Sequence, residues 1–368
     1  GGGGGGGGAL SGPPRHVLCQ MDLTPPLVTL GKALGWEPLP LTIAEGRLFA
    51  QPAISRNTQH ATPCHSPFAI RNSQFAIRNL HFAYDRVDVL HGVNLEIAPG
   101  ELVTLMGRNG SGKTTLLKCI VGLLQPQRGE ITLAGKSLIG QETADTCRSV
   151  GYLPQEPDDL LFADTVADEL AVTLRNHGLF DSPPIAPADL LDHLGLSGLA
   201  ASYPRDLSVG QRQRVALGAI TVTRPHLLLL DEPTRGLDYP AKRELVRLLR
   251  EWQAEGAGVL LVTHDVELVA QAADRVVVLD QGEVIADGPP AEVLTATPPS
   301  HPEAEESPLS LFAPQVARLF PGTGWLTAED ALSGLGVTAD GGTLTLGTAG
   351  DKMGLPHGLS GESSWKVE

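Results

Sequence analysis

A glycine-rich segment that ends in a lysine and two threonines carries the strongest chemical signal in the sequence. Residues 107–115 read GRNGSGKTT and follow an apolar run that predicts a buried strand. Glycines let backbone N–H groups approach phosphate oxygens, and a helix opening at Lys113 would present its positive N-terminal end. The loop predicts a triphosphate site in which Lys113 reaches the outer phosphates and Thr114 binds Mg²⁺. Its candidate ligands are Gly107, Asn109, Gly110, Ser111, Gly112, Lys113, Thr114 and Thr115.

Two adjacent carboxylates follow a second apolar run. Asp231 and Glu232 directly follow the four leucines in the segment HLLLLDEPT. A carboxylate at the C-terminal end of a buried parallel strand faces the crevice where α/β proteins bind ligands. Since successive strand side chains alternate in direction, the two acids have different tasks. We expect Asp231 to hold Mg²⁺ and Glu232 to orient and deprotonate water. Alone, such a pair is usually a solvated strand end.

Alternating strand-like runs and amphipathic helices must position these groups. Between about residues 74 and 297 the pattern is typical of an α/β fold. The runs at 227–231 and 258–263 are almost wholly apolar, which favours parallel strands buried on both faces. An edge strand is expected to end at Tyr84. The other expected strands are Leu102–Met106, Ser149–Leu153, Leu227–Asp231, Gly258–Thr263 and Arg275–Leu279.

Further motifs make the pattern specific. Residues 207–211 read LSVGQ, Gln155 lies in VGYLPQEP, Asp238 in TRGLD and His264 in LVTHD. Each has an ordinary alternative, such as a helix cap for His264 or a packed edge-strand tyrosine for Tyr84. Together, and in this order, they resemble the ATP-binding cassette of the ABC transporter family. The resemblance covers about residues 74–297, and it departs from the usual signature motif only where Val209 replaces glycine.

The resemblance implies a role for each matching residue. Tyr84 would stack on adenine, and Gln155 would sense the γ-phosphate and Mg²⁺ together with Thr114 and Asp231. The catalytic group would be Glu232, His264 and Gln155. In a cassette pair, Asp238 would cross to the partner. The signature residues would meet the γ-phosphate held by that partner; these residues are Ser208, Gly210 and Gln211.

The expected fold is an α/β P-loop NTPase cassette. It has a RecA-like parallel-sheet core, an antiparallel β edge subdomain and an α-helical subdomain inserted at about 156–222. We expect the cassette to span 74–299. Residues 1–67 are expected to be low-complexity sequence with a remnant of an upstream cassette tail, 300–335 a small extension and 336–368 a disordered tail.

The resemblance also suggests a subclass. Arg235, the acidic loop after Gln155 and the segment SPLSLFAPQVARLF resemble energy-coupling-factor (ECF) cassettes of vitamin and transition-metal importers. That subclass implies ATP and Mg²⁺ as cofactors. Its partners are a second cassette, a transmembrane scaffold and a substrate-capture membrane protein, and its location is the cytoplasmic face of the cell membrane. A soluble cassette acting on ribosomes or DNA, and a cassette that binds ATP without hydrolysing it, are the alternatives.

Composition limits these alternatives. The formal net charge of −15 disfavours a nucleic-acid partner, which would need a basic face. The sequence contains no run of about 18 uncharged apolar residues, which is the length that a membrane-spanning helix requires. The four cysteines form no CxxC pair, so they are expected to be reduced thiols.

The flanking segments resemble each other. Residues 23–45 and 311–329 each run Pro, Val, an apolar stretch, Gly-Trp and then Leu-Thr followed by Glu. If the second segment is the tail behind this cassette, the first is the tail of an earlier one, and the chain is the second half of a tandem protein. Chance similarity between short Pro- and Leu-rich segments is the alternative.

Overall fold

The chain forms two compact units, each with its own core. The computed structural model describes residues 14–15, 18, 21, 24–54, 74–295, 314–320, 323, 325–334, 337–340, 343–346 and 365–366. The larger unit contains residues 74–293, and the smaller unit combines the described residues before 64 with residues 294–295 and those from 314 onward.

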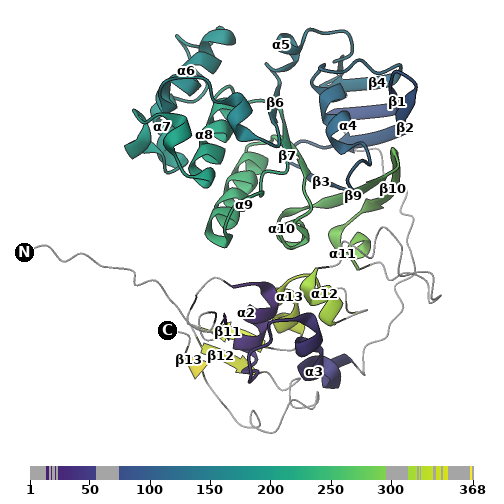
Figure 1. Ribbon diagram of the computed structural model, residues 1–368, viewed down its shortest axis with the longest axis vertical. Helices are drawn as coiled ribbons and strands as arrows, with labels where there is room; N and C mark the ends of the chain where they lie inside the picture. The colour runs from purple at the N-terminus through teal and green to yellow at the C-terminus, as the bar shows by residue number, and fades with distance from the viewer. Residues whose placement is uncertain are drawn as a thin grey trace, which may run out of the picture. The chain divides into compact units, whose positions relative to one another are not determined.

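A six-stranded sheet forms the centre of the larger unit, in the order β10-β9-β3-β8-β7-β6 (Figure 1). All neighbouring strands are parallel except the β9–β10 pair. Every residue of β3, β7 and β8 is buried, as expected for apolar strands covered on both faces. The strands are β3 (Leu102–Met106), β6 (Val150–Leu153), β7 (Leu227–Asp231), β8 (Gly258–Val262), β9 (Arg275–Asp280) and β10 (Glu283–Gly288).

An antiparallel sheet forms a second layer, in the order β2-β1-β4-β5. Its strands are β1 (Phe75–Tyr84), β2 (Val87–Ile97), β4 (Arg128–Leu133) and β5 (Lys136–Ser137). Helix α4 (Lys113–Ile120) belongs to the same apolar core as both sheets, contributing Leu116 and Ile120 beside Phe75 and Leu260. The helix that follows the phosphate loop is therefore anchored by a fully buried face.

Helices form the third part of the larger unit and share a second core with β7 and β8. Leu170, Leu191 and Val215 come from three helices of the inserted segment, and Leu248 comes from α9. These helices are η1 (Pro157–Leu160), α6 (Val166–Asn176), α7 (Pro187–His193), η2 (Ser197–Leu199), η3 (Pro204–Asp206) and α8 (Val209–Thr221). The remaining helices are α5 (Thr143–Thr146), α9 (Tyr239–Ala254), α10 (Val266–Ala272) and α11 (Pro290–Val293).

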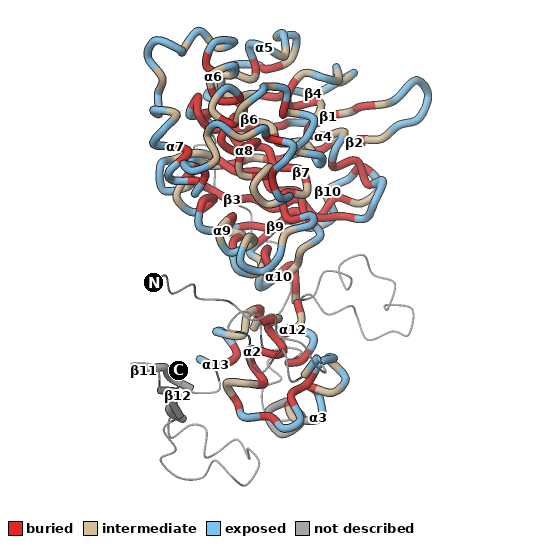
Figure 2. The backbone as a smooth tube through the Cα atoms, turned by 60° about the vertical axis from the view of Figure 1, so that its left-hand side comes forward, coloured by how far each residue is buried: buried red, intermediate tan, exposed pale blue. Residues whose placement is uncertain are grey.

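The fold class expected from the sequence is confirmed, and the predicted strands differ from β3 and β6–β9 by at most one residue at an end. The strand limits could be predicted closely because these strands are buried: Figure 2 shows β3 and β7 in the colour of buried residues. An apolar run that is buried throughout leaves little freedom for where a strand begins or ends.

Four helices of the smaller unit have both ends within the described residues. They are α2 (Pro26–Ala33), α3 (Ile43–Ile54), α12 (Gln315–Leu319) and α13 (Ala328–Gly334). Three short strands follow, β11 (Val337–Asp340), β12 (Thr343–Leu346) and β13 (Trp365–Lys366), within the range predicted as a disordered tail. The limits predicted for the individual domains stay predictions.

Among the described residues, no helix combines the length and apolar character that crossing a membrane requires.

Candidate active site

The candidate site lies at the carboxyl edge of the parallel sheet. Leu105 of β3 pairs with Val262 of β8, and Asp231 of β7 also pairs with Val262. Leu153 of β6 pairs with Leu230, one residue before Asp231. Since these strands are parallel, the loops that follow them leave the sheet at the same edge. The topology thus brings the phosphate loop, Gln155, the two acids and His264 to one edge.

The phosphate loop has a backbone that requires glycine. Gly107, Gly110 and Gly112 have φ angles of 153°, 83° and 104°, a region that side chains disfavour. A Cβ on Gly107 would lie 2.1 Å from the Leu279 carbonyl oxygen, and one on Gly112 would lie 2.8 Å from Leu90 Cδ2. One side of the loop therefore packs closely against β9 and β2, which carry Leu279 and Leu90. Its outer face is open, because Asn109 and Gly110 are exposed.

Lys113 is the first residue of α4 and lies inside the loop. Its Nζ donates hydrogen bonds of 2.8 Å to the carbonyl oxygens of Gly107 and Arg108. Burial lowers the pKa of Lys113, and the nearby carboxylates of Glu232 and Asp231 oppose that shift. The ammonium is thus held by two neutral carbonyls, with capacity for a third, anionic partner.

The start of α4 supplies further polar groups. Ser111 Oγ is buried and has no hydrogen-bond partner among the described residues, an arrangement that calls for a ligand or a water. Thr115 is half-buried, and Gly112 is the N-cap of the helix without any side-chain cap. Unpaired N–H groups at a helix N-terminus form an anion site. The loop therefore fits a phosphate group.

Thr114 and Asp231 are in direct contact. Thr114 Oγ1 donates a 3.0 Å hydrogen bond to Asp231 Oδ2, and Asp231 is only 2% exposed. Burial raises the pKa of Asp231, and the bond from Thr114 and the charge of Lys113 oppose the shift. A hydroxyl beside a carboxylate is the oxygen donor set that Mg²⁺ prefers. These residues fit the expected Mg²⁺ site.

Glu232 and His264 form the second contact at this edge. Glu232 Oε1 lies 3.3 Å from His264 Nε2, and His264 N donates to Glu232 Oε2 at 3.4 Å. Burial raises the pKa of Glu232, whereas burial and the charge of Lys113 lower that of His264. The lowered pKa favours a neutral imidazole at His264, and the Glu232 carboxyl beside it can accept a proton when it is ionised.

The backbone at Glu232 is strained. Its φ is 52°, which is uncommon for a residue with a side chain. Glu232 N donates to the Val262 carbonyl oxygen at 2.8 Å, continuing the β7–β8 pairing one residue beyond the strand. The left-handed turn therefore separates the directions of Asp231 and Glu232, in addition to the alternation expected of a strand.

Gln155 and Tyr84 lie at the surface. Gln155 follows β6 and is exposed, and Tyr84 is 45% exposed at the end of β1. The Tyr84 ring packs edge-on against Phe82, with centroids 4.8 Å apart. The exposed ring has a face available for stacking, and the exposed amide has free capacity for a ligand.

The signature residues lie on a different part of the larger unit. Figure 1 shows α4 and α8 on either side of β7. Ser208, Gly210 and Asp238 line a shared cavity of about 500 Å³ between α8 and α9. The structure thus brings Ser208 and Gly210 to Asp238, and no contact in the described residues brings them to Lys113.

Helix capping explains part of the signature motif. Gln211 N donates to Ser208 Oγ at 3.3 Å, and Ser208 N donates to Gln211 Oε1 at 2.9 Å, a reciprocal capping box at the start of α8. Asp238 caps α9 by accepting from Ala241 N at 2.9 Å. The Ser-x-x-Gln spacing of residues 208–211 is itself a sequence signal for such a cap.

Two ion pairs around the Gln155 loop were not anticipated. Glu156 accepts from Arg235 at 2.8 Å, and Asp158 pairs with Arg212 of α8 at 2.8 Å. They join the segment after Gln155 to the loop after Glu232 and to the signature helix. The only sequence signal was a cluster of acids at 156–159 and an arginine in each of two later motifs, Arg212 and Arg235.

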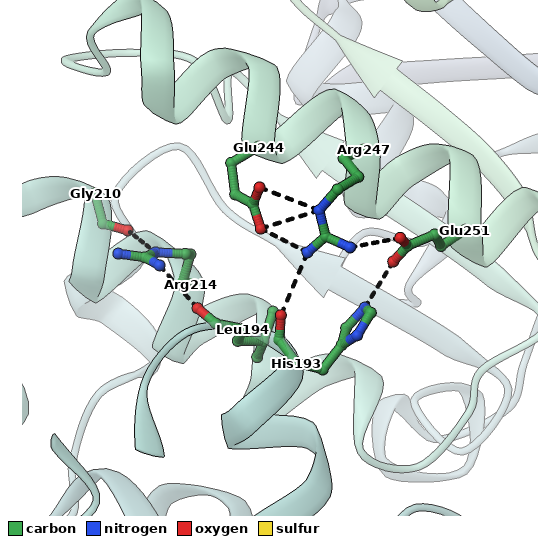
Figure 3. A network of polar contacts seen from close by, with 7 residues as sticks. All are labelled: His193, Leu194, Gly210, Arg214, Glu244, Arg247 and Glu251. Atoms are coloured by element: carbon green, nitrogen blue, oxygen red, sulfur yellow. Dashed lines mark hydrogen bonds and ion pairs between the residues drawn. The ribbon is translucent and has the colours of Figure 1, made fainter. Parts of the chain in front are cut away.

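A polar network connects the inserted helices to α9 (Figure 3). Arg247 contacts Glu244 and Glu251 and donates to the His193 carbonyl oxygen at 3.3 Å. His193 Nε2 lies 2.7 Å from Glu251 Oε2. On α8, Arg214 donates to the Leu194 carbonyl oxygen at 2.8 Å. These contacts orient α7 against α8 and α9, the elements that carry the signature motif and Asp238.

The fold and site define a P-loop nucleotide-binding protein: a glycine loop opens a helix, and two adjacent carboxylates lie at the end of a parallel strand of the same sheet. A family model described as ABC transporter matches residues 90–235. The chain belongs to the family of ABC transporter ATP-binding proteins, which are ATPases.

Several relatives support the family membership. A protein of Streptomyces coelicolor named as an ABC transporter ATP-binding protein is 42% identical over 358 residues, covering 89% of this chain. The chain spans 60% of that relative's length. The energy-coupling factor transporter ATP-binding protein EcfA of Methanothermobacter thermautotrophicus is 38% identical, covering 57% of this chain and 68% of the relative.

Solved structures agree. The structure of cbiO1 from Clostridium perfringens, described as part of the ABC transporter complex cbiONQ, has a TM-score of 0.56 and 31% identity. It covers 61% of this chain and 91% of that chain. An ATP binding subunit of an ABC transporter, 31% identical, has a TM-score of 0.53.

Proposed function

We propose that the larger unit is the ATP-hydrolysing cassette of an ECF-type importer for vitamins or metal ions. The relative named EcfA and the cbiO1 structure support the importer subclass. The partners would be a second cassette, a transmembrane scaffold and a substrate-capture membrane protein, with the cassettes at the cytoplasmic face of the membrane. The transported substrate would be selected by those membrane proteins.

The contact between Glu232 and His264 beside Lys113 carries the proposal. The water oxygen attacks the γ-phosphorus of ATP, its proton passes to Glu232, and the bond to the ADP oxygen breaks. Lys113 and the loop N–H groups bind the phosphates, and His264 holds Glu232 in place. Thr114, Asp231 and Gln155 would hold Mg²⁺, which neutralises charge on the phosphates.

Half of each site would come from the partner. Ser208 and Gly210 lie with Asp238, apart from the Lys113 loop of the same cassette. The signature residues of one cassette would therefore complete the phosphate site of the other. ATP would stabilise the closed pair because it contacts both halves only there.

Variants at Lys113 and Glu232 test the proposal. In the protein assembled with its membrane subunits, Glu232→Gln is expected to retain ATP binding and to lower kcat at least 100-fold, within the range for losing a general base. Lys113→Ala is expected to weaken ATP binding itself. Glu130→Gln, at an exposed position on β4, is the matched control. Unchanged turnover in both site variants contradicts the assignment.

A further inference from the structure

The two helix pairs of the smaller unit begin with the same backbone geometry. Pro25 and Pro314 are the N-caps of α2 and α12, with φ, ψ of −53°, 150° and −58°, 160°. Aligned on these prolines, residues 27–31 and 316–320 have the same order of exposure: two buried, one exposed, two buried. The first helices therefore present equivalent faces to the core of this unit.

The second helices also begin alike. The hydroxyls of Thr42 and Thr327 accept hydrogen bonds from the N–H groups of Glu45 and Asp330, at 3.2 and 3.1 Å. Each acid in turn accepts from the N–H of the residue preceding its threonine, at 2.8 and 3.0 Å. Both helices thus begin with the same Thr-x-x-acid arrangement, in which the threonine caps the helix and the acid accepts from the residue before it. The sequence similarity between the two flanks corresponds to a structural one.

The two pairs pack reciprocally. Helix α3 packs on α12, and α13 packs on α2. Gly46 and Ala331, each one residue after the capping acid, are small and buried. A Cβ on Gly46 would lie 3.1 Å from Leu319 Cδ1 and 2.7 Å from Leu27 Cδ1, so the contact is close. The second helix of each pair therefore covers the first helix of the other.

This arrangement is that of an isologous interface, in which equivalent elements make reciprocal contacts. Its apolar core takes side chains from both pairs: Leu27, Leu30, Leu34, Trp36, Ala50, Val316, Leu319, Phe320 and Ala331. Across it, Arg47 Nη2 donates to the Arg318 carbonyl oxygen at 3.0 Å, and Leu27 N donates to Gln315 Oε1 at 3.2 Å. The smaller unit thus consists of two similar halves that share one core.

We propose that the smaller unit is a constitutive joint between two cassettes. Residues 314–334 are the tail of the cassette described above, and residues 24–54 are the equivalent tail of a second cassette that precedes it in the same protein. The proposal rests on the proposed function for the identity of the partner. Since the joint is apolar and contains no nucleotide-binding residue, it holds the two cassettes at high effective concentration with or without ATP.

Hydrogen exchange on the nucleotide-free full chain tests the pairing. Leu319→Asp is expected to speed exchange in residues 24–54 at least about tenfold, and Leu30→Asp to do the same in residues 314–334, because each places a charge in the shared core. Leu48→Asp, at a 71% exposed position on α3, is the matched control. Exchange in β3 and β7 reports that the cassette remains folded. Unchanged exchange in both tails overturns the proposal.

Self-association tests the equivalence of the tails. In Leu30→Asp the released tail 314–334 is expected to pair with the same tail of a second copy, giving a nucleotide-independent dimer by sedimentation. Leu30→Asp combined with Leu319→Asp is expected to remove that dimer. If Leu30→Asp exposes the tail and no dimer forms, the two tails are not equivalent and the proposal fails.

The two proposals fail separately. The joint is measured without nucleotide, so loss of ATP hydrolysis in Glu232→Gln does not affect it. Conversely, a joint that fails these tests leaves the chemistry at Lys113 and Glu232 unchanged.

Discussion

At the scale of single residues, burial is the main cause of the shifted pKa values of the charged groups in the candidate site. Asp231 is 2% exposed and Lys113 is 8% exposed, so their environment, more than bulk water, determines how strongly each charge acts. Glu232 is held by its own strained backbone and by His264. A small displacement of either group would change the position of the proton acceptor.

The raised pKa of Glu232 predicts the pH dependence of catalysis. A general base must be ionised, and burial shifts its ionisation above the ordinary value of 4.5. Activity is therefore expected to fall, on lowering the pH, at a higher pH than for an ordinary glutamate. The kcat–pH profile of the assembled protein checks this. An acid limb centred at 4.5 or below contradicts it.

The same shift predicts an effect on stability. The folded carboxyl binds its proton more tightly than the unfolded one, so ionised Glu232 costs stability above the unfolded pKa, and the full cost is reached above the folded pKa. Glu232→Gln is expected to raise the free energy of unfolding at pH 7, with the gain shrinking as the pH falls toward 4. Denaturant unfolding at both pH values measures it, and Glu130→Gln serves as the control.

At the scale of elements, caps place functional groups at helix ends. Ser208 and Thr165 both accept a hydrogen bond from the third residue of their helices, α8 and α6. The first lies in the signature motif, and the second does not. The comparison separates the structural role of a cap from a functional one.

Alanine at each cap is expected to lower the free energy of unfolding by about 0.5–2 kcal/mol, the usual cost of a lost N-cap. Only Ser208→Ala is expected also to lower kcat in the cassette pair, since its hydroxyl would face the partner's phosphate. Denaturant unfolding and ATP turnover are the two measurements. Equal turnover in both variants contradicts a functional role for Ser208.

A buried arginine joins the two sheets of the larger unit. Arg275 of β9 bonds Glu101 at 3.0 Å, Asp287 of β10 at 2.5 Å and the Glu96 carbonyl oxygen of β2 at 3.0 Å. Arg275→Ala leaves two carboxylates without this partner and is expected to cost about 3–5 kcal/mol of unfolding free energy. Arg250→Ala, which breaks an exposed pair with Asp274, is the control at about 0–1 kcal/mol.

At the scale of the whole molecule, the chain has two compact units with separate cores. Nucleotide would contact the larger unit alone. ATP at about 100 times its Kd is therefore expected to stabilise that unit by about 2.7 kcal/mol and to leave the smaller unit unchanged. Hydrogen exchange in increasing denaturant, followed separately in β7 and in α2, measures both. A parallel shift in both units contradicts independent stability.

Much of the larger unit could be predicted from the sequence. The strands at 102–106 and 227–231 match the structure because almost wholly apolar runs of this length favour strands buried on both faces. The phosphate loop could be predicted from a short stretch of sequence, because its backbone conformation requires glycine at 107, 110 and 112. Order along the chain was enough to name the family, since each motif depends on a few neighbouring residues.

The tertiary structure alone decided what distant residues do together. Two ion pairs join residues far apart along the chain, Glu156 with Arg235 and Asp158 with Arg212. The fold brings these side chains together, and their spacing in the sequence does not specify the pairing. The similarity of the two flanks was visible in the sequence, but their reciprocal packing was not. Local patterns determine which face of a helix is apolar, and only the fold determines which other helix covers it.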